Sequence, residues 1–329
     1  MVKRLLFLTV PLAAFVLCVC GGASAQNSVE PSFTLKQVGP NVWAAMSNPK
    51  SSAPAGANTG FVIGDDAVAV IDTTVSADAE LNFTTEPAQR LLAAIRSVTT
   101  LPVRFVINTH HHLDHAGANA VFVNAGAVVL AHHNVRDWLS SENVRLFGTE
   151  IKPGQKAFIE AMTPPTVTYE QGVDLYLGSR VIRVRSFPGH TGGDSVVLIP
   201  DAKVVFAGDL FWHDIAPTLI DASTGPLIET LSVLAKNEPG TTFVPGHGDV
   251  GNAQDVTAFR DYLTTLRTLI SNAQARGLSG DALADAVMPV LSEKYSRWDA
   301  FTYVARTNIL ETDAELRGTK RTPQARSLK

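Results

Sequence analysis

The sequence predicts an α/β protein in which two β-sheets pack together with helices outside them, all in one domain. Short β-branched runs alternate with helical patterns along most of the chain. With 329 residues and 45% apolar content, the chain can bury a large core. The sequence shows no repeat or low-complexity stretch, which argues against a repeat architecture.

The first 25 residues have the pattern of an export signal. Lys3 and Arg4 precede an apolar run from Leu5 to Cys20, and the small residues 23–25 follow it, which predicts cleavage before Gln26. The run has about 16 residues, fewer than the roughly 20 that span a bilayer, so no stable membrane anchor is expected. We therefore expect the protein to be secreted across the inner membrane into a periplasm.

Charge and cysteine content limit the possible partners and ligands. Without Lys3 and Arg4, 25 basic residues remain against 31 acidic ones, a formal charge of −6, which argues against a nucleic-acid partner. Both cysteines, Cys18 and Cys20, lie in the predicted signal. The mature chain then has no thiol, so any metal site must be built from nitrogen and oxygen ligands.

The N-terminal third is predicted to be mainly strands. Short apolar runs from Phe33 to Thr74, broken by Gly, Asn and Pro, predict antiparallel strands with a turn at residues 64–66. Apolar residues at helical spacing predict a helix over residues 86–98. The β-branched run 103–107 predicts a buried strand that leads directly to the residues of greatest chemical interest.

The rest of the chain is predicted to alternate between strands and helices. Strands are expected at 127–131, 181–187, 195–199, 203–207 and 242–244. Helices are expected at 116–124, from about 134, near 226–236, and at 253–275, 280–292 and 298–317. These elements complete a domain of residues 26–318, with C-terminal helices over 253–317, and residues 319–329 are expected to form a disordered tail.

Four histidines and an aspartate follow the strand 103–107, in the stretch Thr109-His110-His111-His112-Leu113-Asp114-His115. His110 and His112 are two residues apart, so on an extended chain their side chains face the same way. Asp114 and His115 lie where the chain turns toward the next helix. His111 then points elsewhere and is expected to be structural.

Three further candidates each follow a predicted strand and a glycine: His190 in Pro188-Gly189-His190, Asp209 in Ala207-Gly208-Asp209, and His247 in Pro245-Gly246-His247. Glycine allows a sharp turn and a close approach of the backbone. Because strand ends gather at one edge of a sheet, these side chains can converge on the histidine-rich loop.

The series His110-x-His112-x-Asp114-His115, Gly-His190, Gly-Asp209 and Gly-His247 resembles the metallo-β-lactamase-fold superfamily over roughly residues 33–249. The resemblance implies an αββα sandwich with two zinc ions in a shallow groove at one edge of the sheets. It implies that His110, His112 and His190 hold one ion and Asp114, His115 and His247 the other, with Asp209 bridging them. Imidazole and carboxylate ligands suit zinc.

This site implies hydrolysis. Two ions roughly 3.5 to 4 Å apart polarise a substrate oxygen and lower the pKa of a bound water to about 7. The expected reaction is attack by a hydroxide held between the ions on an ester, thioester or amide (lactam) carbonyl of a small molecule, with Asp114 and Asp209 as the catalytic carboxylates. Trp212 and His213, close after Asp209, are predicted to contact the substrate. His132 and His133 are expected to have loop or helix-start roles.

The substrate stays open at this level. Lactamases with a cysteine ligand are excluded because the mature chain has no thiol, and those with Asp-His-His as the second set lack the bridging acid Asp209. The residues from Thr109 to Asn119 are close to the glyoxalase II pattern, although an export signal is unusual for an enzyme of glutathione metabolism. Residues 58–66 and 244–248 resemble exported zinc hydrolases associated with sulfur oxidation or quinoprotein systems.

Two alternatives remain beside an ester or thioester hydrolase. The first is a β-lactamase, which opens a lactam ring. The second is a non-catalytic zinc-binding protein, for which a missing ligand would be expected, whereas every ligand position is filled. The oligomeric state, and the choice of zinc over iron or manganese, are not determined by the sequence.

Overall fold

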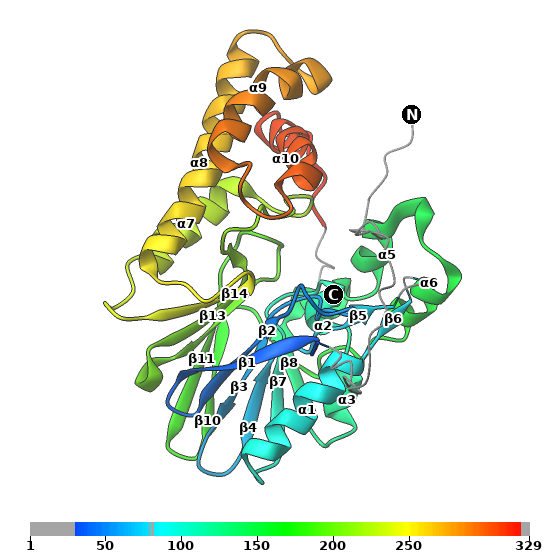
Figure 1. The fold of residues 1–329 in the computed structure, drawn as a ribbon, viewed down its shortest axis with the longest axis vertical. Helices are drawn as coiled ribbons and strands as arrows, with labels where there is room; N and C mark the ends of the chain where they lie inside the picture. The colour runs from blue at the N-terminus through cyan, green and yellow to red at the C-terminus, as the bar shows by residue number, and fades with distance from the viewer. Residues whose placement is uncertain (1–29, 79, 81, 324–329) are drawn as a thin grey trace, which may run out of the picture.

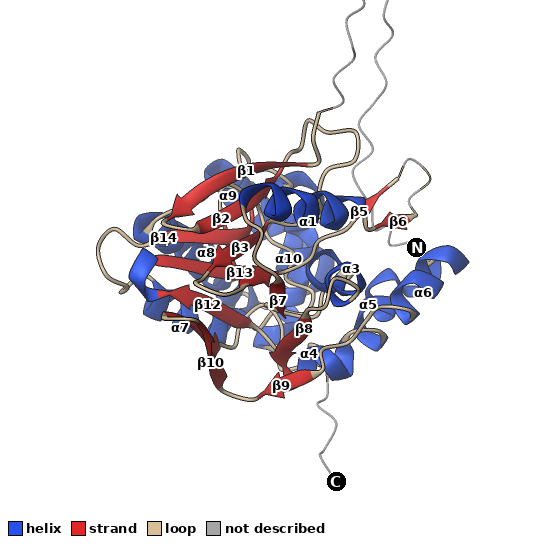
Figure 2. Cartoon of the chain, turned by 90° about the horizontal axis from the view of Figure 1, so that it is seen from below, coloured by secondary structure: helices blue, strands red, loops and turns tan. Residues whose placement is uncertain are grey.

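The computed structural model describes residues 30–323 apart from 79 and 81, and the predicted export signal lies outside these residues. Two β-sheets lie face to face, and helices cover their outer faces (Figures 1 and 2). The predicted α/β sandwich with C-terminal helices is therefore confirmed. Within the described residues, no helix is long and apolar enough to cross a membrane.

The first sheet has seven strands in the order β1-β2-β3-β4-β7-β8-β9. The first four pair antiparallel, and the last three join them in parallel. Their bounds are β1 Phe33–Gly39, β2 Val42–Ser47, β3 Thr59–Ile63, β4 Val68–Ile71, β7 Val103–Ile107, β8 Val128–His132 and β9 Val167–Tyr169. The short strands β5 (Ser76–Ala77) and β6 (Phe83–Thr84) form a separate pair.

The second sheet has five strands in the order β10-β11-β12-β13-β14. The strands β10 to β13 pair antiparallel, whereas β13 and β14 run parallel. Their bounds are β10 Gly172–Leu177, β11 Arg180–Ser186, β12 Ser195–Ile199, β13 Val204–Trp212 and β14 Thr242–His247. Because β11 and β13 both oppose β12, the carboxyl ends of β11, β13 and β14 lie at the same edge of this sheet.

The helices fall into three groups. On the outer face of the first sheet lie α1 (Glu86–Val98) and α3 (Asn119–Val123), and beside them α2 (Leu113–Ala116), α4 (His133–Trp138), α5 (Ser141–Phe147) and α6 (Pro153–Glu160). Helices α7 (Thr224–Leu234) and α8 (Ala253–Ala275) contact β13 of the second sheet, and α9 (Gly280–Tyr295) and α10 (Phe301–Leu316) pack on α8 beyond the end of the sandwich, at the top of Figure 1. Short 3₁₀ turns span Gly148–Glu150 and Pro200–Ala202.

Three apolar clusters hold these layers together. Residues such as Val62, Ile107 and Phe206 fill the space between the sheets, and α1 covers the first sheet with Leu91 and Ile95. Each such side chain, once buried, contributes roughly 1.5 to 3 kcal/mol. The layered packing thus fixes the sheet edge that carries the predicted ligands.

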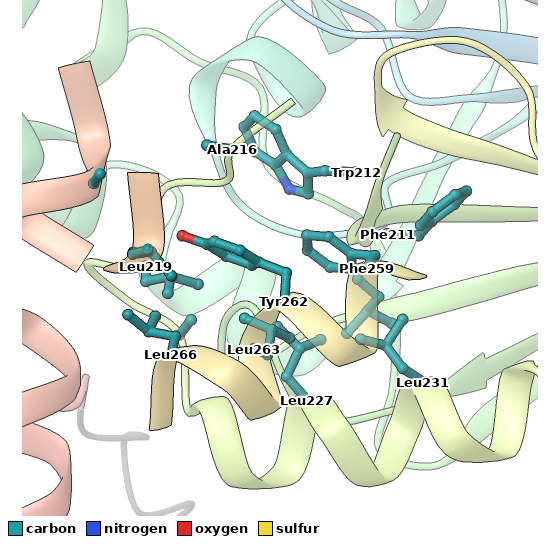
Figure 3. Close-up of a cluster of buried hydrophobic side chains, with 14 of the residues drawn as sticks. Phe211, Trp212, Ala216, Leu219, Leu227, Leu231, Phe259, Tyr262, Leu263 and Leu266 are labelled. Carbon is teal, nitrogen blue, oxygen red and sulfur yellow. The ribbon is translucent and has the colours of Figure 1, made fainter. Parts of the chain in front are cut away.

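Helix α8 shows why the C-terminal helices pack where they do. Its buried residues recur every three or four positions, which places them on one face of the helix: Val256, Phe259, Tyr262, Leu263, Leu266, Ile270 and Ala273. A capping box between Asn252 and Asp255 fixes its start. Figure 3 shows Phe259 and Tyr262 packed toward Phe211 and Trp212, so α8 supports the end of β13 from outside.

Several predicted elements differ from the structure. Strand β13 continues to Trp212 instead of ending at residue 207, and the predicted helix 116–124 is divided into α2 and α3. Helices α5 and α6 and strands β9 and β10 had no clear signal, since α5 and α6 are short and β9 and β10 are partly exposed. The disordered tail expected from residue 319 is not observed over residues 319–323, where Lys320 and Arg321 make specific contacts.

Candidate metal centre

The seven predicted ligands come together at the carboxyl-terminal edge of the sandwich. Strand β7 leads into the loop that carries four of them, the loop after β11 carries His190, β13 carries Asp209 and β14 ends at His247. They form two groups, and within each group the ligand atoms lie within 4.8 Å of one another. One group is His110, His112, His190 and Asp209, and the other is Asp114, His115 and His247. We call these the first and the second half-site.

The first half-site has three imidazole rings and one carboxylate. The Nε2 atom of His190 lies 3.1 Å from Nδ1 of His112 and 3.3 Å from Oδ2 of Asp209. The Nε2 atom of His110 lies 3.9 Å from the same carboxylate oxygen. Three ring nitrogens and one oxygen therefore face a common point, which suits tetrahedral coordination of zinc.

The second half-site adjoins the first through Asp209. The Nε2 atom of His247 lies 3.3 Å from Oδ2 of Asp114, and that of His115 lies 3.7 Å from the same oxygen. Asp209 is equally close, with Oδ1 3.0 Å from Nε2 of His115 and Oδ2 3.4 Å from Nε2 of His247. The carboxylate of Asp209 thus lies between the two half-sites.

Two glycines make this close approach possible. Gly208 has a φ of +51°, a conformation that other residues rarely adopt, and a Cβ there would lie 2.6 Å from Oγ1 of Thr109. A Cβ on Gly246 would lie 1.8 Å from Oδ1 of Asp209. Any side chain at residue 246 would therefore displace the shared carboxylate.

Two buried aspartates hold the far side of the ligand rings. Asp72, directly after β4, accepts hydrogen bonds from N and Oγ1 of Thr109, and its Oδ2 lies 2.8 Å from Nδ1 of His115. Asp221 lies 3.2 Å from Nε2 of His112. Such outer partners fix which ring nitrogen carries the proton and leave the other free to bind a metal.

Unpaired polar atoms at the centre fit the binding of metal ions. Among the described residues, Nε2 of His110, Nε2 of His115 and Oδ1 of Asp209 are buried and make no hydrogen bond of good geometry, although the last two atoms lie 3.0 Å apart as an ion pair. Buried polar atoms without a partner are costly and call for an explanation such as an ion. The nitrogen and oxygen donors, grouped in two sets that share a carboxylate, match a pair of divalent cations.

Burial keeps the rings of His110 and His190 in the first half-site neutral. It lowers the pKa of His110 well below its usual value and that of His190 to about 3, and the neighbouring imidazoles add to this effect. A neutral imidazole is the form that binds a metal. These rings therefore need to release no proton at neutral pH.

The second half-site is dominated by opposite charges. Burial disfavours a charged ring, but nearby Asp209 and Asp114 outweigh it, raising the pKa of His115 well above its usual value and that of His247 to about 9. Burial alone would raise the pKa of Asp114, but His115 and His247 lower it to about 2. Burial also opposes ionisation of Asp209, but His247 and His115 keep its pKa well below the usual value. Both carboxylates are therefore ionised at neutral pH.

The site opens to solvent on the side of the second half-site. The side chain of Asp114 is 33% exposed, that of His247 16% and that of His112 12%. The side chains of His110, His115, His190 and Asp209 are buried. A substrate can therefore reach the centre past Asp114 and His247.

The predicted substrate contacts have other neighbours in the structure. The indole of Trp212 is only 7% exposed and stacks on the ring of His247, with centroids 4.0 Å apart and an angle of 24°. The Nδ1 atom of His213 lies 2.9 Å from the carbonyl oxygen of Asp249. Trp212 therefore packs against the candidate metal ligand His247. Contact between Trp212 and a substrate stays a prediction.

The remaining histidines lie around the centre. His111 is buried and packs edge-on against Trp138, with centroids 5.8 Å apart. His132 ends β8 and its Nδ1 accepts a hydrogen bond from the backbone of Asn134, while His133 begins α4. None of the three belongs to either half-site.

Sequence reasoning missed Asp72 and Asp221. Asp72 follows the buried strand 68–71, so the strand-end rule that found Asp209 could also have found it. Asp221 lies in an irregular stretch between β13 and α7, where no local pattern marks it. Only the tertiary structure brings it to His112.

Two sheets with outer helices form an αββα sandwich, and two groups of histidines and aspartates that could hold metal ions lie at one edge of it. A family model described as the metallo-beta-lactamase superfamily matches residues 53–247, and the chain belongs to this superfamily. It is accordingly a hydrolase with the metallo-β-lactamase fold.

Individual relatives agree with this family. The chain is 29% identical to a protein named hydroxyacylglutathione hydrolase from Mesorhizobium japonicum over 48% of its own length, and it spans only about half of that relative (52%). It is 28% identical to a protein of the same name from Brucella ovis, over 64% of this chain and 75% of the relative. A metallo-β-lactamase structure from Pontibacter korlensis superposes with a TM-score of 0.56 and 22% identity, over 70% of this chain and 99% of that one, which supports the fold.

Proposed function

We propose that this protein is a dinuclear zinc hydrolase that cleaves thioester or ester bonds of small molecules. The observation that carries the proposal is the position of Asp209, whose carboxylate lies within 3.4 Å of ring nitrogens from both half-sites. A single carboxylate so placed can bridge two ions. The residues of the first half-site would hold one zinc and those of the second the other.

Zinc ions held by these residues would polarise a carbonyl oxygen and lower the pKa of a bound water to about 7. The chain's own residues provide the rest of the site. Asp209 stays ionised because His247 and His115 hold its pKa low. Asp114, ionised and one-third exposed, is placed to accept a hydrogen bond from a water on the open side and to orient it toward a substrate.

The residues around the centre hold its candidate ligands in place. Asp72 and Asp221 hold the rings of His115 and His112 at a fixed angle, so the ligands need little rearrangement when a substrate binds. Trp212 excludes water from the inner side of His247. Attack on the carbonyl carbon followed by expulsion of a thiolate or an alkoxide is the reaction that these features support.

A thioester is favoured by the relatives named hydroxyacylglutathione hydrolase and by the shared carboxylate of Asp209. A β-lactamase remains the second candidate, and the observation in its favour is the full Asp114, His115 and His247 set at the open half-site. A non-catalytic zinc-binding protein is disfavoured because the described residues fill every ligand position of both half-sites.

The substrate proposal is tested with the purified, zinc-loaded protein and its metal content measured on the same sample. A glutathione thioester and a chromogenic cephalosporin are offered in parallel, with and without a chelator. Chelator-sensitive thioester turnover with two zinc ions per chain supports the proposal. Turnover of the cephalosporin alone would contradict it and favour the lactamase, and fewer than two bound metals would contradict the dinuclear centre.

We also propose that the protein acts after export, in a periplasm. The support is the signal-like pattern of residues 1–25, in which Lys3 and Arg4 precede an apolar run and a small-residue cleavage site. Expression of the full chain in a bacterium, followed by fractionation and mass measurement, tests this. A periplasmic product that begins at Gln26 is expected, whereas a cytosolic product that retains residue 1 would contradict it.

A further inference from the structure

We propose that the end of the chain positions the metal ligand His112 through a chain of charged side chains, Arg321, Glu142, Arg145 and Asp221. Glu142 and Arg145 belong to α5, Asp221 to the loop before α7, and Arg321 follows the last helix. We call these four residues the charge relay. The inference rests on the proposed dinuclear centre and concerns how its first half-site is held.

The relay begins at the ring of His112. Its Nδ1 lies 3.1 Å from Nε2 of His190 and so faces the centre, while its Nε2 lies 3.2 Å from Oδ2 of Asp221. An ionised Asp221 accepts a hydrogen bond from Nε2–H, and this tautomer leaves the Nδ1 lone pair free for a metal. Asp221 is therefore a positioning residue for the only first-half-site ring whose Nδ1 faces the centre among the described residues.

Asp221 itself needs support, because its side chain is only 2% exposed. An uncompensated buried carboxylate is costly, and one that rotates or takes up a proton would release His112. The guanidinium of Arg145 pairs with its Oδ1 on the side opposite His112. The hydrogen bond with His112 at Oδ2 and the pair with Arg145 at Oδ1 therefore give both oxygens of Asp221 a partner.

Arg145 is in turn fixed by a second carboxylate. Its Nε donates to Oε2 of Glu142, 2.5 Å away, and Glu142 is mostly buried. Arg321 then contacts both oxygens of Glu142 through Nη1 and Nη2, each at 2.8 Å. This two-point pairing fixes the direction as well as the distance of the contact.

A second contact joins the same end of the chain to the loop that carries Asp221. The Nζ atom of Lys320 donates to the carbonyl oxygens of Leu219 and Ala222, which lie on either side of Asp221. Lys320 thus holds the backbone of this loop while Arg321 holds α5. The two contacts come from neighbouring residues, so both would be lost together if the chain ended after α10.

The ligand atoms of His111, His112 and Asp221 also lie within 4.8 Å of one another, the distance expected of a third metal group. Arg145 argues against a cation there, because its guanidinium already pairs with Asp221 and would repel one. The relay accounts for the close approach of Asp221 to His112 without a further ion.

The experiment compares metal binding by the full chain and four variants, using zinc competition against a chelating dye to obtain two binding constants. Asp221→Asn should weaken one of the two constants by about 10- to 100-fold and leave the other near its original value. Arg321→Ala acts through a half-exposed ion pair, so it should weaken the same constant by only about 2- to 5-fold. Arg145→Ala should resemble Asp221→Asn.

Arg306→Ala is the matched control, because Arg306 also pairs with carboxylates of a neighbouring helix, on α9, but lies outside the relay. Cobalt-substituted protein gives a readout independent of turnover: the exchangeable Nε2–H proton signal of His112 should broaden in Asp221→Asn and Arg321→Ala and persist in Arg306→Ala. Thermal unfolding of the metal-free variants shows that each is folded.

The outcomes separate this inference from the proposed function. A wild-type chain with two bound metals, and unchanged constants in both Asp221→Asn and Arg145→Ala, would overturn the relay and leave the dinuclear centre intact. Equal behaviour of Arg321→Ala and Arg306→Ala would overturn the part assigned to the end of the chain. A wild-type chain that binds fewer than two metals would overturn the proposed function, and the relay with it.

Discussion

The histidine pKa values shift in opposite directions in the two half-sites. In the first, burial keeps His110 and His190 neutral, and the rings lie deep below the surface. In the second, Asp114 and Asp209 raise the pKa of the rings beside them, and the site is open to solvent. The first half-site thus has two buried neutral rings, whereas the second has ionised carboxylates beside rings of raised pKa and is more exposed.

For the proposed dinuclear centre, this difference indicates separate roles for the two ions. A mostly buried half-site with three rings suits a structural anchor for an ion. The exposed half-site, with its ionised carboxylate, is where a substrate and a water can enter. Asp209 lies close to the rings of both half-sites, so its replacement should affect both of them.

The largest effect is expected from Asp209→Asn. The amide bridges two cations poorly, so both half-sites should lose affinity, and hydrolysis should fall by about 1000-fold, equal to several kcal/mol of lost electrostatic stabilisation. Metal content and turnover are measured on the same sample. Two tightly bound metals and near-normal turnover would show that the half-sites are independent and that Asp209 is not shared.

Trp212→Ala tests the wall of the second half-site. Removing a buried indole should lower the free energy of unfolding by about 3 to 5 kcal/mol and loosen the ring of His247. Trp298→Ala is the control, because Trp298 packs against the same helices through Tyr262 but does not touch a ligand. Chemical denaturation and the Michaelis constant are measured for both variants. A raised Michaelis constant with unchanged stability would instead make Trp212 a substrate contact.

Asp114→Asn should weaken metal binding at the second half-site and leave metal binding at the first unchanged. Only the second should lose its metal, giving one bound zinc per chain, with a loss of activity of about 100-fold, the upper end for weakened metal sites. Asp66→Asn, a change at an exposed carboxylate paired with Arg104, serves as the control. Full activity, or loss of both metals together, would contradict the assignment of Asp114 to one half-site.

The smallest effect concerns Asp194, which ends the turn that follows His190 and accepts hydrogen bonds from Thr191. Burial raises its pKa to about 6, although the Thr191 hydrogen bonds oppose this. The folded protein therefore binds this proton more tightly than the unfolded chain, so its stabilising contribution is complete below pH about 4 and is lost as the pH rises to about 6. The loss amounts to about 2 to 3 kcal/mol.

Replacing Asp194 with Asn should remove this part of the pH dependence. The free energy of unfolding of metal-free protein is measured by denaturant titration between pH 4 and pH 7 for both chains. The difference between them should change by about 2 kcal/mol across that range. Parallel curves for the two chains would show that folding does not raise the pKa of Asp194.

The sequence was enough to predict the bounds of elements whose apolar residues recur at regular helical or strand spacing. The helices 86–98 and 253–275 and the strands 103–107 and 195–199 have the bounds that their apolar spacing predicts. Short helices such as α5 and partly exposed strands such as β10 gave no such signal, because their apolar residues are few. Strand β13 was predicted to end at residue 207 because Gly208 interrupts its pattern, yet pairing with β14 resumes beyond it.

The sequence by itself predicted the types and order of the candidate ligands, because glycine-preceded His and Asp residues after β-branched runs are local features. It placed Asp209 after a strand, whereas Asp209 lies within β13. Only the tertiary structure decided what holds those ligands. Asp72, Asp221 and Arg145 are assembled from separate elements, and their roles depend on burial and on distances across the fold. A side chain's partner and its desolvation are properties of the packed molecule, so no local pattern records them.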